Sequence, residues 1–172
     1  MNTQTGPGPR KTVVITGAST GIGAATARHL SQQGWCVFAG VRKKADGDRL
    51  KDGAAGDLRP IILDVTDPES VEAAVKTVAD ALGTTRLAGL VNNAGIARMG
   101  PLALQPLEDF EAHFSVNVFG MLRVTQAFVP LLGSDPARTG SPGRIVNITS
   151  VGGKISAPFL ERFRFQRKHN QH

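Results

Sequence analysis

The sequence predicts a doubly wound α/β fold, in which helices cover both faces of a parallel sheet of about five strands. Short apolar runs alternate with longer helical patterns, and this order favours a parallel sheet with right-handed crossovers. The runs are continuously apolar rather than alternating, as expected for strands covered on both faces. The expected strands are residues 12–16, 35–39, 60–64, 87–92 and 144–149.

Helices are expected between these strands, at 21–33, 68–82 and 107–132, with one short helix within 43–56. Asp67 suits the N-cap of the second helix, and Pro68 suits its first helical position. Apolar residues at helical spacing should lie along one side of each helix. They are Val71, Val75, Val78 and Leu82 in the second helix, and Phe110, Phe114, Val118 and Leu122 in the long one.

The length of 172 residues suits one domain, with two ends of different composition. We expect residues 1–10, which are polar and rich in Gly and Pro, to be a disordered arm. Residues 11–160 form the expected domain, and 161–172 a basic tail in which the strand and helix pattern stops.

Composition excludes several classes of partner. Most of the net charge of +6 lies at the two ends, which leaves about +1 for the body, so we expect no nucleic-acid partner. No apolar run approaches the ~20 residues of a membrane span, so no membrane partner is expected. Cys36 is the only cysteine and lies in an apolar run, which indicates a buried thiol and a reducing, cytoplasmic location.

A glycine-rich segment follows the first expected strand and opens the first expected helix. Its residues are Thr16-Gly17-Ala18-Ser19-Thr20-Gly21-Ile22-Gly23. In a dinucleotide site, Gly17 would permit the tight turn, Gly21 the approach of a pyrophosphate, and Gly23 the packing of helix on strand. The helix N-terminus would offer N–H groups to the phosphates. A simple tight turn is the alternative.

Further motifs follow in order, and with the glycine segment they resemble the short-chain dehydrogenase/reductase family. They are Asp64-Val65, Asn92-Asn93-Ala94-Gly95, Asn117 within a helix, and Ser150 within 143–153. The resemblance implies an NAD(P)-binding Rossmann domain over 11–160, with Asn117 and Ser150 as catalytic residues. It implies cofactor contacts at Gly17, Ser19, Thr20, Gly21, Ile22, Gly23, Arg42, Asp64, Val65, Asn93, Ala94 and Gly95. Turn chemistry for Asn92 and Asn93 and a structural amide for Asn117 stay as alternatives.

The residues after the second strand favour NADP over NAD. An acidic residue about 20 positions past the glycines would bind the ribose 2′-hydroxyl of NAD. None is present there, and Arg42 could meet a 2′-phosphate. The alternative is that Arg42 and Lys43 are solvated loop charges.

The catalytic tyrosine of the family is missing, because the sequence contains no tyrosine. The resemblance implies a Tyr as general acid/base and a Lys that lowers its pKa, and Phe163 and Arg167 stand at those spacings. Phenylalanine has no hydroxyl, and arginine stays protonated. We therefore expect the chain to be inactive as written, although the family interconverts alcohols and ketones.

The family resemblance stops at Glu161. This abrupt end favours a frame shift or truncation over the alternative, in which Phe163 and Arg167 are genuine replacements of the Tyr and Lys. The C-terminal part of the family fold would then be missing, including part of the interface through which family members oligomerise. The fifth strand would be an open edge, and we expect poor solubility or compensating association. The sequence thus supports two functions: an oxidoreductase that lacks its active-site helix, or a non-catalytic NADP-binding or interaction protein.

Overall fold

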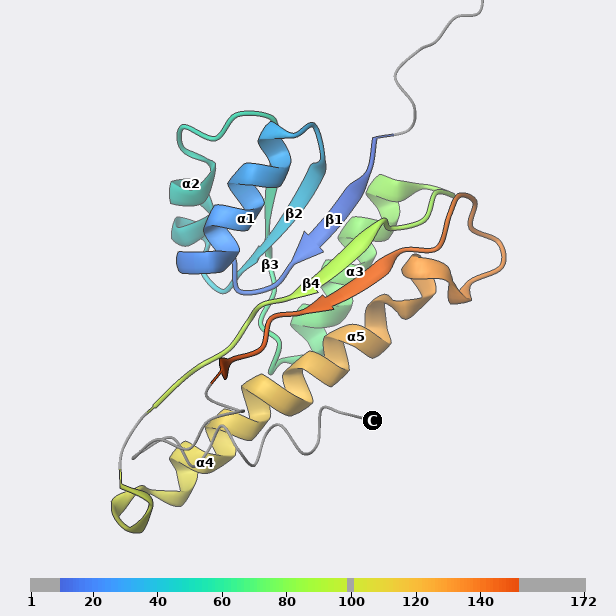
Figure 1. Cartoon of the computed structure of the whole chain (residues 1–172). Helices are drawn as coiled ribbons and strands as arrows, with labels where there is room; N and C mark the ends of the chain where they lie inside the picture. The colour runs from blue at the N-terminus through green and yellow to red at the C-terminus, as the bar shows by residue number, and fades with distance from the viewer. Residues whose placement is uncertain (1–9, 99–100, 152–172) are drawn as a thin grey trace, which may run out of the picture.

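The computed structural model describes residues 10–98 and 101–151. Five parallel strands form one sheet in the order β3-β2-β1-β4-β5 (Figure 1). They are β1 (Thr12–Ile15), β2 (Cys36–Val41), β3 (Asp57–Ile62), β4 (Gly89–Asn92) and β5 (Arg144–Asn147). The sheet grows outward from β1 in both directions, so the order of the strands reverses between β3 and β4. This reversal confirms the predicted doubly wound fold.

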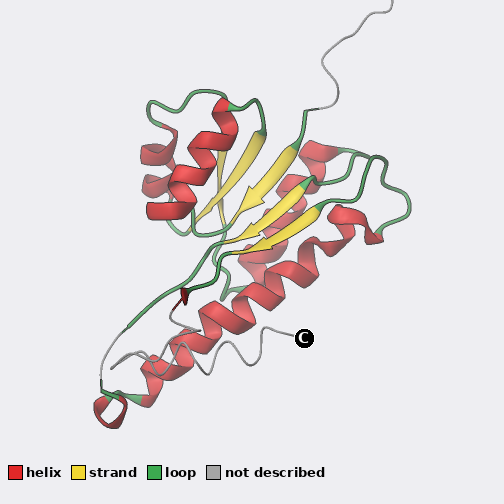
Figure 2. Ribbon diagram, in the orientation of Figure 1, coloured by secondary structure: helices red, strands yellow, loops and turns green. Residues whose placement is uncertain are grey.

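Helices cover both faces of this sheet (Figure 2). On one face lie α1 (Gly21–Gln32) and α2 (Lys44–Lys51), and on the other lies α3 (Pro68–Leu82). A short 3₁₀ turn, η1 (Leu102–Leu104), leads into a helical run on the same face as α3, in which Gly133 near the end has non-helical backbone angles. The run consists of α4 (Leu107–Phe114), η2 (Ser115–Gly120), α5 (Met121–Val129) and η3 (Pro130–Ser134).

Two apolar cores form because successive residues of a strand point to opposite faces of the sheet. Val13 belongs to the core that includes Ala27 of α1. Val14 belongs to the core on the other face, with Val78 of α3 and Phe128 of α5. In both cores the apolar faces of the helices pack on the faces of the sheet. The loops at the ends of the strands therefore lie at the surface.

Local chemistry sets the start of α3, as predicted. The Asp67 carboxylate accepts a hydrogen bond from the Glu69 N–H at 3.0 Å, and Pro68 occupies the first turn. The bounds of α3 coincide with the prediction, and α1 ends one residue earlier than predicted. Capping signals therefore located the start of α3 from sequence alone.

The long helix has the predicted extent to within two residues, but its faces differ from the prediction. Segments η2 and η3 have π-helical hydrogen bonding, which adds residues to a turn and rotates the later residues about the helix axis. As a result Val118 is buried, whereas Leu122 is 49 % exposed. The i, i+4 spacing had predicted that both lie on one side.

By length and composition, the helix Leu107–Ser134 could cross a membrane. This corrects the sequence expectation, which considered only uninterrupted apolar runs. One face of the helix nevertheless packs on the sheet, where Val124, Phe128 and Leu131 belong to the core. A core helix of a globular domain passes the same test of length and composition.

The two edge strands correct the prediction in different ways. β3 begins at Asp57 rather than at residue 60, because its pairing with β2 starts there and the apolar run 61–63 marks only its end. Of its six residues only Leu58 is buried. β5 was predicted to be covered on both faces, but all four of its residues are exposed, including Ile145 and Val146. Among the described residues β5 pairs only with β4, so it is a sheet edge, as predicted.

Candidate nucleotide-binding site

The glycine loop joins the end of β1 to the start of α1, at the carboxyl end of the sheet (Figure 1). Gly17 has a φ of +64°, and a Cβ there would lie 2.7 Å from the Ala94 Cα. Gly21 has a φ of +58°, and a Cβ there would meet no atom within 4 Å. Gly17 therefore packs against the loop after β4, while the backbone at Gly21 is open to a ligand.

The N-terminus of α1 is open to an anion. Thr20 is the N-cap residue, but its side chain makes no capping bond, and the first turn contains no acidic residue. Within 10–98 and 101–151, no hydrogen bond engages the N–H groups of Gly21, Ile22 and Gly23. Free N–H groups and the helix dipole together attract phosphate. The Ile22 side chain beside them is 65 % exposed.

Thr16 and Asn93 fasten the glycine loop to the loop after β4. The Thr16 hydroxyl accepts hydrogen bonds from the N–H groups of Asn93 and Ala94, at 3.0 and 2.9 Å. The Asn93 amide donates to the carbonyls of Thr16 and Gly17, at 2.9 and 3.0 Å. A Cβ at Gly23 would lie 2.4 Å from the Asn93 amide nitrogen. The same Cβ would lie 2.5 Å from the Gly17 carbonyl oxygen, so Gly23 makes room both for the segment just after β1 and for Asn93.

Asp64 and Val65 follow β3, in the loop beyond that of β2 along this edge. The Asp64 Oδ1 atom accepts hydrogen bonds from the Thr66 N–H and hydroxyl, at 2.9 and 2.7 Å. The Asp64 N–H donates to the Ser70 hydroxyl of α3 at 2.9 Å. Asp64 Oδ2 has no partner in the described part of the chain, so it can accept from a ligand.

Asn117 holds the chain just beyond Gly95. Its Oδ1 atom accepts from the Ile96 N–H, and its Nδ2 atom donates to the Ile96 carbonyl, both at 2.9 Å. Asn117 lies in η2, where π-helical bonding replaces the regular α-helical pattern. Both ends of the Asn117 amide are thus bonded to the backbone of a loop at the mouth of the site.

Arg42 lies directly after β2, with its side chain exposed. Neither Arg42 nor Lys43 forms an ion pair or hydrogen bond through its side chain with another described residue, whereas the next residue, Lys44, pairs with Asp48 at 2.8 Å. Arg42 is therefore a guanidinium without a carboxylate partner, among the described residues, at the carboxyl edge of the sheet.

Ser150 lies three residues beyond β5 and is exposed, at the same end of the sheet as Asn117. Ser19 and Thr20 of the glycine loop are half-buried and exposed, respectively. The structure thus brings predicted residues from the loops after all five strands to one sheet edge. Phe163 and Arg167, at the predicted Tyr and Lys positions, lie outside the described residues.

A family model described as short chain dehydrogenase matches residues 11–162. The chain belongs to the short-chain dehydrogenase family. The match begins one residue before β1 and includes every strand of the sheet. Fold and family therefore agree on a Rossmann domain of the short-chain dehydrogenase type.

Curated relatives of the chain include retinol dehydrogenase 5 of Mus musculus, which is 42 % identical over 146 residues, or 84 % of this chain and 44 % of the relative. NADPH-dependent 3-dehydrocapnine reductase of Ornithobacterium rhinotracheale is 34 % identical over 86 % of this chain and 52 % of its own. Mitochondrial D-beta-hydroxybutyrate dehydrogenase of Rattus norvegicus is 39 % identical over 86 % and 43 %. The chain thus spans about half the length of these relatives.

A crystal structure of a short-chain dehydrogenase from Streptomyces avermitilis is similar to the chain. The two superpose with a TM-score of 0.82 at 30 % identity, over 94 % of this chain and 57 % of the other. This agreement supports the strand order and the placement of the loops at the carboxyl end of the sheet.

Three residues that hold the site have roles that the sequence did not predict. Thr16 belongs to the glycine motif, but its hydroxyl also bridges two loops. His113 is 1 % exposed, and its Nε2 atom accepts from the Arg98 N–H at 2.9 Å. Arg123 donates to the Val65 carbonyl at 2.6 Å. Only the tertiary contacts show these roles, because each pair is at least 15 residues apart in the chain.

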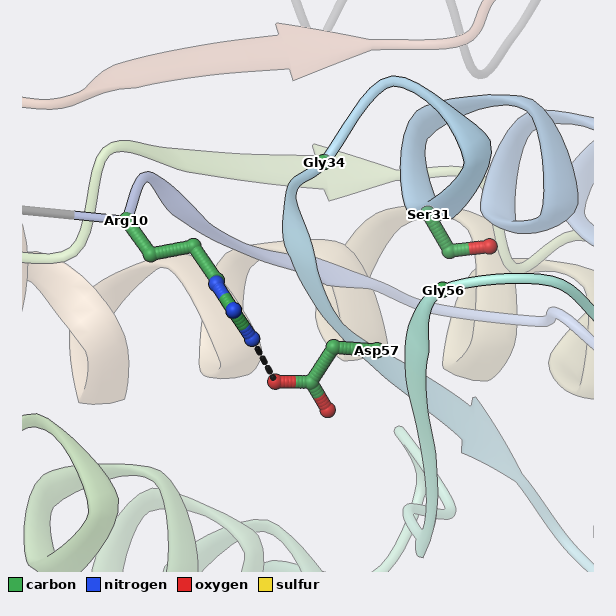
Figure 3. A pocket seen from close by; sticks show the side chains of 5 residues that line it. All are labelled: Arg10, Ser31, Gly34, Gly56 and Asp57. Carbon is green, nitrogen blue, oxygen red and sulfur yellow. Dashed lines mark hydrogen bonds and ion pairs between the residues drawn. The ribbon is translucent and has the colours of Figure 1, made fainter. Parts of the chain in front are cut away.

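A hollow of about 420 Å³ lies at the opposite, amino end of the sheet, where no site was predicted (Figure 3). It is lined by Arg10, Ser31, Gly34, Gly56 and Asp57. Arg10 lies 3.2 Å from Asp57. A hydrogen bond from Arg59, and then its charge, lower the pKa of Asp57. The Asp57 carboxylate thus pairs with both Arg10 and Arg59. We therefore assign no binding role to the hollow.

The Cys36 thiol lies near this end and is buried, as predicted. Burial raises the pKa of the Cys36 thiol, and the neighbouring Asp57 charge raises it further. A thiol with a raised pKa stays protonated near neutral pH and is a poor nucleophile. The structure therefore gives Cys36 a packing role.

Proposed function

We propose that this chain binds NADP(H) at the carboxyl end of its sheet, as the nucleotide-binding part of a short-chain dehydrogenase that interconverts an alcohol and a ketone. The observation that carries the proposal is the glycine loop, whose N–H groups at 21–23 are free in the described residues. The open space at Gly21 fits a pyrophosphate, which would be bound at the N-terminus of α1. Asp64 Oδ2 would accept from the adenine amino group. Bound NADPH would supply the hydride.

The preference for NADP rests on Arg42. A guanidinium without a carboxylate partner can bind a 2′-phosphate through two parallel hydrogen bonds, and the residue directly after β2 is Arg42 rather than an acidic residue that would accept from a ribose hydroxyl. One relative is named as an NADPH-dependent reductase, which agrees with this preference.

A charge reversal at Arg42 tests the preference. Titration of the full chain, monitored by nucleotide fluorescence, should give tighter binding of NADPH than of NADH. Arg42→Asp should reverse that order, because a carboxylate repels the 2′-phosphate and accepts from the ribose hydroxyl. Lys51→Asp changes the charge equally at the far end of α2 and should leave the order intact. Equal effects of the two substitutions would contradict a direct contact at Arg42.

A second function is favoured by the absence of tyrosine from all 172 residues. The phenol that the family resemblance implies as proton donor is not among them, and loss of general acid/base catalysis costs about 10²–10⁴-fold in rate. We therefore also propose that this chain binds the nucleotide without turning it over. Asn117 and Ser150 would still be present at the substrate side of the site.

A reductase assay distinguishes the two functions. NADPH oxidation should be measured with a simple ketone, at saturating nucleotide, on the same preparation that gave the binding constant. Binding without turnover supports the nucleotide-binding function. Turnover at a rate ordinary for an enzyme, about 1–10³ s⁻¹, would show that a group other than tyrosine delivers the proton.

A further inference from the structure

The long helix contacts the loop that carries Asp64 and Val65 at two points. The guanidinium of Arg123 in α5 donates to the Val65 carbonyl at 2.6 Å. One helical turn earlier, Gly120 leaves room for the Val65 side chain, since a Cβ there would lie 2.7 Å from Val65 Cγ2. Residues three apart lie on the same face of a helix. Val65 is thus held through both its backbone and its side chain.

Arg123 makes its polar contact in the described residues with Val65 alone. No carboxylate pairs with it there, and the Val65 carbonyl accepts from its guanidinium. The side chain is half-buried, so ordering it costs conformational entropy that a solvated arginine would retain. A hydrogen bond from a charged group to a carbonyl is stronger than a neutral one, which offsets this cost.

The opposite side of the loop is bonded by other residues. Ser70 of α3 accepts from the Asp64 N–H, and Thr66 donates twice to Asp64 Oδ1. These bonds orient the carboxylate and leave Oδ2 without a partner in the described part of the chain. Together with the core around Val65, Arg123 and Gly120 then set how far Asp64 and Val65 lie from the glycine loop, because no strand pairing extends beyond β3 into residues 64–67.

We propose that Arg123 is a positioning residue for the adenine end of the nucleotide site, acting through the Val65 carbonyl. This inference rests on the proposed binding of NADP(H). Arg123 touches no part of the nucleotide. It holds the distance between the loop after β3 and the loop after β1, and an adenine ring has to fit between these loops.

The test measures binding of three probes to the full chain: NADPH, adenosine 2′,5′-bisphosphate, and reduced nicotinamide mononucleotide, which lacks adenine. Arg123→Met keeps the length of the side chain and removes the donors. It should lower the affinities for NADPH and adenosine 2′,5′-bisphosphate by a similar factor, about 5- to 20-fold, which corresponds to the loss of one strong hydrogen bond. Binding of the mononucleotide should not change. Arg123→Lys keeps a charged donor and should restore most of the affinity.

Arg138 provides a matched control. Its guanidinium also donates to backbone carbonyls, those of Gly83 and Thr85, but at the other end of the sheet. Arg138→Met should lower the midpoint of thermal unfolding without changing any of the three affinities. Gly120→Ala gives a second route to the same loop, because the new methyl group pushes Val65 away from the helix. It too should weaken the two adenine-bearing probes selectively, even if Arg123→Met does not fold.

Two results overturn the inference while the proposed function stands. In one, the wild type binds NADPH and both Arg123→Met and Gly120→Ala bind it equally well. In the other, these variants weaken the mononucleotide as much as adenosine 2′,5′-bisphosphate, which indicates general loosening of the site. A wild-type chain that binds none of the probes overturns the proposed function and this inference together.

Discussion

The side chains that hold the loops differ between the two ends of the sheet, although Arg123 at the carboxyl end and Ser31 at the amino end depart from the pattern. At the carboxyl end, the neutral side chains of Thr16, Asn93 and Asn117 bond to backbone groups of neighbouring loops. At the amino end, the charged side chains of Arg10 and Asp57 pair with each other at the surface. The carboxyl end keeps free N–H groups at 21–23 in the described residues, whereas at the amino end Arg10 and Asp57 pair with each other.

This difference indicates where binding can take place. Amides and hydroxyls fix loops without placing a carboxylate beside the N-terminus of α1, so a phosphate meets no local negative charge. Surface ion pairs contribute little to stability and need no exact backbone position. Substitutions at the carboxyl end should therefore affect stability and nucleotide affinity together, while those at the amino end should affect stability alone.

The largest effect is expected for Gly17→Ala. Gly17 has a positive φ and lies against Ala94, so a methyl group there is strained and overpacked. We expect a loss of about 2–4 kcal/mol in the free energy of unfolding. Affinity for NADPH should fall with it. Denaturant unfolding and NADPH titration measure both quantities.

Gly34→Ala is the control at the amino end. Gly34 also has a positive φ, of +85°, but a Cβ there would meet no atom within 4 Å. It should cost only about 1–2 kcal/mol, from the backbone conformation alone, with affinity for NADPH intact. Equal losses of unfolding free energy in the two variants would show that the contact between residue 17 and Ala94 does not affect stability.

A smaller effect is expected for Asn117→Ala. The substitution leaves the N–H and carbonyl of Ile96 without their side-chain partner, which should cost about 1–3 kcal/mol and weaken NADPH binding. Ser31→Ala at the amino end removes a buried hydroxyl that donates to the Ala55 carbonyl at 2.8 Å. It should cost stability alone. The comparison breaks down if Ser31→Ala lowers NADPH affinity as much as Asn117→Ala does.

The smallest effect is expected for Asp57→Asn, and it depends on pH. The folded state lowers the pKa of Asp57, mainly through a hydrogen bond from Arg59, so the carboxylate binds its proton less readily than in the unfolded chain. Its stabilisation is therefore fully present above the unfolded pKa and is lost as the pH falls through the folded pKa. Because the group is at the surface, we expect less than about 1 kcal/mol at pH 7.

Urea unfolding of wild type and Asp57→Asn, at neutral pH and again under acid conditions, measures this difference. The two curves should differ at neutral pH and converge in acid, with NADPH affinity at neutral pH the same in both. A difference that grew as the pH fell would show that the sign of the Asp57 contribution is wrong.

Much of the fold could be predicted because its signals are local. Asp67 and Pro68 marked the start of α3, and apolar runs marked β1 and β2 to within two residues. β3 was placed too late because Asp57, Arg59 and Pro60 do not form an apolar run. An edge strand carries polar residues, and its pairing with β2 is visible only in the assembled sheet.

The long helix shows a limit of a different kind. Its range was predicted to within two residues. The side on which Leu122 lies was predicted wrongly, because the π-helical turns of η2 shift the helical register. Whether an Asn inside such a helix binds substrate or backbone was likewise open from sequence. The structure shows that the Asn117 amide bonds Ile96, and this is compatible with a further role toward substrate.

By itself the sequence determined the order of the elements, the glycine loop at the start of α1, and the lack of a tyrosine. Each of these depends only on neighbouring residues or on the composition. Only the tertiary structure decided that Thr16 bridges to Asn93, that Gly23 makes room for the Asn93 amide, and that Arg123 holds Val65. The hydrogen bonds among these contacts join residues between 58 and 78 positions apart, and such a bond depends on how the layers of the fold pack, which no local pattern records.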